Sequence, residues 1–143
     1  MNKTVKALLD AKGRDVFEIA PDSTVYAALS LMAEHNIGAV LVCEDSKLVG
    51  ILSERDYARK VILHDRASRE TLAEDIMTSD VQTVTPDDSV DHCMELMTTG
   101  RFRHLPVLDG EDVIGLISIG DVVKTVIETQ QSLIGDLERY ITG

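Results

Sequence analysis

A serine followed three residues later by an aspartate occurs at two corresponding places in the chain. Ser53–Asp56 and Ser118–Asp121 each follow directly after an apolar run that predicts a strand. At a helix start, the serine caps the first turn and the aspartate lies near the positive end of the helix dipole. Backbone N–H groups there can also bind phosphate, but a carboxylate repels it, so the aspartate suits vicinal hydroxyls better. The motif therefore has two interpretations, a plain helix cap or a site for the ribose and phosphate of a ribonucleotide.

A cluster of cations precedes the last predicted strand hairpin, although the chain has a formal net charge of −11. Arg101, Arg103 and His104 lead directly into the apolar run 105–108, which predicts a buried strand. One interpretation is a phosphate site where the strand begins. The alternative places the arginines in solvent beside carboxylates such as Asp109, where an exposed ion pair contributes at most about 1 kcal/mol. That alternative accounts for Arg101 better than for Arg103.

These residues belong to an internal repeat that covers most of the chain. Residues 17–62 align with residues 82–127 without a gap. Each copy predicts a short strand (about 16–19 and 81–84), an amphipathic helix, a strand hairpin and a second helix. In the first copy, the apolar face of that helix consists of Val25, Ala28, Leu29 and Met32. The order is β-α-β-β-α twice. We expect an α/β (α+β) fold in which the two copies form a pseudo-twofold pair and one compact module.

The segments outside the two copies are also predicted to fold, with short helices near residues 4–11 and 71–75. Apolar residues continue along the last helix from Val123 to Ile141, beyond the repeat that they would cover. This surplus apolar surface predicts a partner, most simply a second copy of the chain in a homodimer. We expect four segments: an N-terminal helical segment (1–15), the first repeat (16–63), a linker (64–80) and the second repeat with an extended C-terminal helix (81–143).

The two copies together resemble a tandem pair of cystathionine-β-synthase (CBS) domains. The resemblance rests on GILSERDYARK and GLISIGDVVK, on RFRHLPVLDG and on IMTSDVQTVTPDDSV, and it covers nearly the whole chain. It implies two clefts between the repeats that bind an adenine nucleotide, with AMP first and ATP, NAD(H) or S-adenosylmethionine as other choices. It also implies a stand-alone regulatory module, not an enzyme, that passes its ligand state to an unidentified protein effector.

The resemblance implies roles for individual residues. Asp56 and Asp121 become the candidates for binding ribose. The candidates for the phosphate and the helix starts are Ser53, Arg55, Arg103, His104, Ser118, Ile119 and Gly120. The candidates for the base pocket are Ile37, Gly38, Ala39, Thr83, Pro86, Phe102 and Pro106.

The two copies differ in where they carry cations. Arg103 and His104 of the second copy align with a Gly-Ala pair in the first, whereas Arg55 of the first copy aligns with Gly120 in the second. We therefore expect two clefts of different charge, and we expect the cleft that holds Asp121 to bind phosphate more tightly.

Composition disfavours several other classes of function. The acidic net charge disfavours nucleic-acid binding and adsorption to anionic membranes, because both need a basic surface. No apolar run approaches 18 residues and the N-terminus lacks the apolar core of a signal peptide, so we expect a cytoplasmic protein. The motifs of phosphate-binding loops, zinc proteases and serine hydrolases do not occur, so we expect neither catalysis nor a bound metal.

Two alternatives stay open. One is a structural or oligomerising module whose clefts are unoccupied. The other is a redox- or metal-linked sensor that uses Cys43, Cys93 and the histidines. Cys93 falls on the core face of its predicted helix, which argues against that role.

Overall fold

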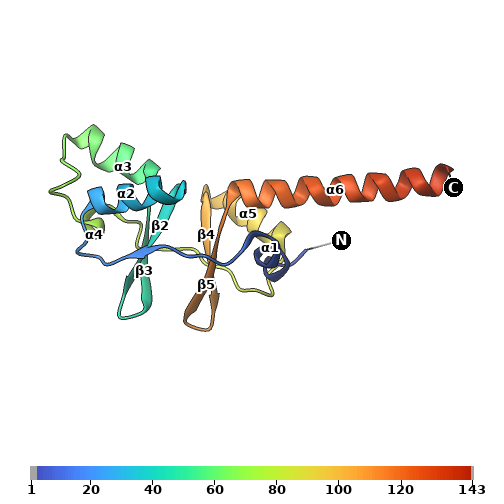
Figure 1. Ribbon diagram of the computed structural model, residues 1–143, viewed down its shortest axis with the longest axis horizontal. Helices are drawn as coiled ribbons and strands as arrows, with labels where there is room; N and C mark the ends of the chain where they lie inside the picture. Colours follow the sequence, from blue (N-terminus) through green and yellow to red (C-terminus); the bar gives the residue numbers. More distant parts are fainter. Residues whose placement is uncertain (1–2, 143) are drawn as a thin grey trace. The chain divides into compact units, whose positions relative to one another are not determined.

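Two compact units make up the computed structural model, which describes residues 3–142 (Figure 1). Among these residues, unit 1 comprises 3–14, 83–109 and 114–142, and unit 2 comprises 15–82 and 110–113. The N-terminal segment of the chain therefore folds with the second repeat. The architecture is mixed α/β with two small sheets, so the fold class predicted from the sequence is confirmed.

Unit 2 combines a three-stranded sheet with helices. Its elements are β1 (Glu18–Ile19), α2 (Val25–His35), β2 (Ala39–Glu44), β3 (Lys47–Ser53), α3 (Glu54–Lys60), the 3-10 helix η1 (Ile62–His64) and α4 (Ala73–Ile76). The sheet order is β1-β2-β3, with β1 parallel to β2 and β2 antiparallel to β3. Asp45 and Ser46 have φ values of 51° and 66°, the backbone conformation of a tight two-residue hairpin turn.

The amphipathic helix expected in each repeat is present and buries the expected face. In α2 the buried residues are Val25, Ala28 and Met32, which share a core with Val40 and Leu52 of the sheet. Steps of three and four residues place such side chains on one side of a helix. The pattern of apolar residues therefore determines which side of the helix faces the strands.

Unit 1 combines a two-stranded sheet with three helices. Its elements are α1 (Val5–Lys12), α5 (Val90–Gly100), β4 (His104–Asp109), β5 (Asp112–Ser118) and α6 (Ile119–Thr142). α5 buries Val90, Cys93 and Met97 in one core with Leu105 of β4 and Ile117 of β5. None of the helices within residues 3–142 has the length and apolarity needed to cross a membrane.

The prediction of a strand at residues 81–84 is wrong. In the described part of this segment, Val84 makes one isolated parallel bridge, to Val107 of β4. Val84 N donates to the carbonyl oxygen of Pro106 (3.0 Å), and Leu108 N donates to the carbonyl oxygen of Val84 (2.9 Å).

Proline explains why this pairing stops after one bridge. The next hydrogen bonds in either direction would need the N–H of Pro86 or of Pro106, which proline lacks. In unit 2, Leu41 occupies the position of Pro106, and its N–H donates to the carbonyl oxygen of Phe17 (3.0 Å). The first repeat therefore forms the short strand β1, whereas the second does not.

The segment that precedes each repeat packs on the other repeat. Val5 N at the start of α1 donates to Asp88 O (2.8 Å), and Ala73 N at the start of α4 donates to Ser23 O (2.7 Å). These bonds occupy corresponding positions in the two units. α1 therefore belongs to the structure of unit 1, which is also where α6 begins.

Glycines allow these segments to approach the strands closely. A Cβ atom on Gly115 of β5 would lie 2.7 Å from Cδ2 of Leu9, and one on Gly50 of β3 would lie 2.9 Å from Cγ of Met77. A side chain at either position would displace Leu9 or Met77. The paired glycines therefore let these side chains pack directly on the strands in both repeats.

Candidate functional site

The first serine–aspartate motif forms the start of α3. Ser53 Oγ accepts a hydrogen bond from Asp56 N (3.2 Å), and Asp56 Oδ2 accepts bonds from Ser53 N (2.9 Å) and Ser53 Oγ (3.0 Å). This reciprocal capping box is the plain interpretation of the motif. Lys60, one turn further along α3, pairs with Asp56 Oδ1 at 3.2 Å.

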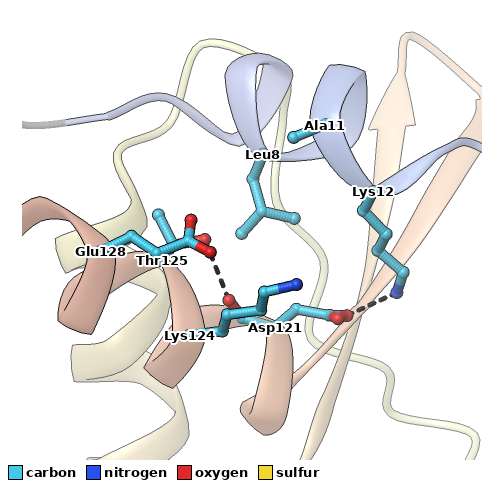
Figure 2. Close-up of a pocket in the computed structure, with 7 residues that line it drawn as sticks. All are labelled: Leu8, Ala11, Lys12, Asp121, Lys124, Thr125 and Glu128. Carbon is cyan, nitrogen blue, oxygen red and sulfur yellow. Dashed lines mark hydrogen bonds and ion pairs between the residues drawn. The ribbon is translucent and has the colours of Figure 1, made fainter.

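The second motif makes the same two backbone bonds at the start of α6. Ser118 N donates to Asp121 Oδ2 (2.8 Å), and Asp121 N donates to Ser118 Oγ (3.2 Å). A third partner comes from α1, because Lys12 Nζ lies 2.5 Å from Asp121 Oδ2 and 2.6 Å from the carbonyl oxygen of Leu116 (Figure 2). Lys12 thereby connects the end of α1 to the start of α6.

Asp121 is held in its ionised form. Burial alone would raise the pKa of Asp121, but the hydrogen bonds from Lys12 and Ser118 and the charge of Lys12 outweigh it. The pKa of this carboxyl group therefore lies below its ordinary value. At neutral pH the start of α6 presents a carboxylate that accepts hydrogen bonds.

A cavity of about 320 Å³ lies between α1 and α6, beside this carboxylate (Figure 2). It is lined by Leu8, Ala11, Lys12, Asp121, Lys124, Thr125 and Glu128. Thr125 Oγ1 donates to the carbonyl oxygen of Asp121 (3.0 Å), which fixes one wall. The lining carries charges of both signs, which is suited to a small polar ligand more than to an apolar one.

The entrance of β4 is joined to the start of α6 by a backbone bond. Ile119 N donates to the carbonyl oxygen of Arg103 (2.9 Å), so the backbone of Arg103 lies beside the second motif. The side chain of Arg103 is exposed. In unit 2 the corresponding bond runs from Glu54 N to Gly38 O (3.1 Å), and Gly38 has no charged side chain.

The other predicted site residues differ in exposure. Arg55 and Gly120 are exposed within the first turns of α3 and α6. Ala39 and Pro106 are buried in β2 and β4, so they shape their surroundings without exposing a side chain. The half-buried residues are Ile37, Gly38, Thr83, Pro86, Phe102 and His104.

Sequence reasoning missed the residues of α1 and the middle of α6 that surround Asp121. Lys12 is 109 positions away from Asp121 in the chain, and no local pattern connects them. In the structure, Val5 and Leu9 take the places that Ala73 and Met77 have in the other linking segment. This correspondence is visible only once the chain has folded.

Comparison with known proteins identifies the family. The family model of the CBS domain matches residues 10–63 and 73–128. The chain belongs to the CBS domain family. The tandem CBS pair predicted from the sequence is thereby confirmed.

Relatives match over nearly the full length of this CBS pair. The chain is 40% identical over 149 residues to "CBS domain-containing protein CBSX3, mitochondrial" of Arabidopsis thaliana, covering 98% of this chain and 72% of that protein. The crystal structure of the CBS-domain containing protein ATU1752 from Agrobacterium tumefaciens superposes with a TM-score of 0.82 at 42% identity, covering 86% of this chain and 98% of that one. The CBS domain pair of protein MJ0100, solved in complex with 5′-methylthioadenosine and S-adenosyl-L-methionine, gives a TM-score of 0.80 at 24% identity, covering 90% and 99%. At that identity the last likeness concerns the fold alone.

The two cysteines of this CBS pair have weakly acidic thiols. Burial, together with a hydrogen bond to Glu18 and its charge, raises the pKa of Cys43 to about 12. Burial and the charge of Asp88 raise the pKa of Cys93 to about 11. Because the thiolate is the reactive form, these raised pKa values lower the reactivity of both cysteines at neutral pH. Within residues 3–142 no three His, Cys, Asp or Glu side chains lie close enough together to hold a metal ion.

Proposed function

We propose that this CBS pair is a regulatory protein that binds an adenine nucleotide, with AMP as the first candidate, at the start of α6. The observation that supports it most is the ionised carboxylate of Asp121, held by Ser118 where the backbone of Arg103 meets the helix. Vicinal ribose hydroxyls would donate to this carboxylate. The guanidinium of Arg103, with the adjacent His104, would bind the phosphate.

We propose that side chains contribute more to phosphate binding than the backbone N–H groups at the start of α6. Ile119 N already donates to Arg103 O, and Asp121 N donates to Ser118 Oγ. These two amides of the first turn are therefore engaged within the protein, which weakens the helix N-terminus as a phosphate site. We therefore propose the side chain of Arg103, and not the start of α6, as the main phosphate-binding group.

A second and weaker site is proposed at the start of α3. Asp56 and Ser53 repeat there the hydrogen bonds that Asp121 and Ser118 make. The strand entrance beside them carries Gly38 instead of an arginine, and Arg55 is the nearby cation. We therefore propose that the two sites differ in affinity and that the site at Asp121 fills first.

Regulation is proposed to act by linkage, without catalysis. A ligand that prefers one arrangement of the protein shifts the population toward that arrangement, and a protein effector senses the shift. Membership of the CBS domain family supports this regulatory role. A ligand-dependent interaction with another protein would need no separate effector domain in this chain. The effector, the homodimer and the cytoplasmic location remain predictions; the Arabidopsis relative carries the word mitochondrial in its name.

A thermal-shift panel with AMP, ADP, ATP, NAD, NADH and S-adenosylmethionine tests the proposal. A ligand at 100 times its Kd adds about 2.7 kcal/mol to the free energy of unfolding. For a chain of this size that corresponds to a rise in Tm of about 5–10 °C. If no member of the panel raises Tm, the proposal is rejected in favour of a structural module with unoccupied sites.

Three variants assign the site. Asp121→Asn keeps the size of the side chain but removes its charge, and Arg103→Ala removes the guanidinium. Both should reduce the ligand-induced rise in Tm. Arg101→Ala is the matched control, because Arg101 is exposed and lies two residues before Arg103. If the variants at 101 and 103 respond alike, the phosphate role of Arg103 is wrong even where binding is real.

A further inference from the structure

α6 exposes a line of large apolar side chains along most of its length. Val123, Ile127, Ile134, Leu137 and Ile141 are between 42% and 80% exposed. Figure 1 shows α6 as a long helix that ends at the C-terminus of the chain. An apolar surface of this kind is unusual unless another molecule covers it.

The spacing of these residues is that of a coiled-coil seam. Together with Gln130 they follow one another in alternating steps of four and three residues, from Val123 to Ile141. Such steps keep one narrow face of a helix apolar, and that face packs knobs-into-holes against a second helix. Leu133 and Tyr140, which are 59% and 87% exposed, flank the seam on one side.

We propose that α6 pairs with α6 of a second copy of the chain in antiparallel orientation, about a two-fold axis near residue 132. The layers of the seam are then Val123 with the partner's Ile141, Ile127 with the partner's Leu137, and Gln130 with the partner's Ile134. Each layer occurs twice because the interface is isologous. The polar Gln130 beside the axis helps to fix the register, as a single polar side chain does in other coiled coils.

The charges beside the seam favour the antiparallel orientation over the parallel one. In the antiparallel pair, Lys124 lies beside the partner's Glu138 on one side of the seam, and Leu133 meets the partner's Leu133 on the other. In a parallel pair, Glu138 would lie beside Leu133 of the partner, and Lys124 beside Ile119. Only the antiparallel orientation pairs charge with charge and apolar side chain with apolar side chain.

The opposite face of α6 supports the same interface. Ser132, Asp136 and Arg139 lie away from the seam, and Arg139 forms an ion pair with Asp136 on its own helix. The seam itself carries no carboxylate and no cation between Val123 and Ile141. A second copy therefore fits the apolar face while the polar face remains in solvent.

Sedimentation equilibrium of the purified chain without ligand tests the pairing and its orientation. The parent should be dimeric at micromolar concentration. Leu137→Glu should raise the dimer Kd at least about 100-fold, because the symmetric interface loses that burial twice. Ser132→Glu, on the polar face, is the matched control and should leave the Kd unchanged; circular dichroism checks that each variant keeps its helices.

A charge exchange tests the orientation. Lys124→Glu should weaken the dimer by placing like charges together, and adding Glu138→Lys should restore it. A monomeric parent, or a Leu137→Glu variant as dimeric as the parent, would overturn the pairing. A dimer that the second exchange does not restore would overturn the antiparallel register. Because no ligand is used, these outcomes are independent of the nucleotide proposal.

Discussion

Replacing Lys12 with methionine removes an ammonium group while keeping most of the side-chain volume. The lysine donates to Asp121 Oδ2 at 2.5 Å and to Leu116 O at 2.6 Å, and the two paired side chains are 36% and 24% exposed. An ion pair in full solvent contributes about 0.2–1 kcal/mol, and a hydrogen bond to a charged group about 1.5–3 kcal/mol. Partial exposure places this pair between the two, so we expect a loss of about 1–2 kcal/mol and a fall in Tm of about 3–6 °C.

The effect of Lys12→Met should depend on pH. The pKa of Asp121 is lowered in the folded protein, so its ionisation stabilises the fold above its unfolded pKa, near 4, and that contribution is lost as the pH falls through the folded value. The variant lacks the lysine that lowers this pKa. The difference in stability between parent and variant should therefore be largest above about pH 5 and should shrink toward pH 3.

Chemical denaturation of both proteins from pH 3 to pH 7 measures this difference. Arg14→Met is the matched control, because Arg14 forms an exposed pair with Asp10 within the same N-terminal segment (2.7 Å). The control should cost less than about 0.5 kcal/mol at any pH. A Lys12→Met effect as small as the control's, or one that is equal at pH 3 and pH 7, would refute the reasoning.

Two further predictions concern packing and thiol chemistry. Gly115→Ala should lower stability by about 1–3 kcal/mol, because the new Cβ would press on Leu9, whereas Gly135→Ala in the exposed part of α6 should raise it by about 1 kcal/mol. Urea denaturation of both variants measures this, and equal effects of the two changes would contradict it. Cys43 and Cys93 should react with a disulfide reagent at pH 8 far more slowly than free cysteine, since their pKa values are about 12 and 11. Labelling as fast as that of free cysteine would contradict this prediction and favour the redox-sensor alternative.

Local patterns in the sequence were sufficient for most of the fold. The steps of three and four apolar residues predicted the buried face of α2, and the Ser118–Asp121 spacing predicted a capped helix start. Both features are decided by neighbours within one or two turns. The strand at 81–84 failed because its pairing depended on the N–H groups of the partner strand, and Pro106 has none. Lys12 could not be predicted in the same way, because its partner is distant in the chain.

The structure adds a second difference between the serine–aspartate motifs of the two repeats. The sequence placed the difference in Arg103, which has no counterpart at Gly38. The two aspartates also differ in their counterions: Asp56 pairs with Lys60 on its own helix, whereas Asp121 pairs with Lys12 of α1. A hydroxyl that donates to Asp121 Oδ2 has to share that oxygen with Lys12 or replace it, and replacement removes a contact that holds α1. A ligand at Asp56 would disturb a pair within α3, whose Lys60 also donates to the carbonyl oxygen of Ile76 in α4 (2.9 Å). If the proposed ligand binds at the start of α6, we therefore expect its binding to be thermodynamically linked to the docking of α1.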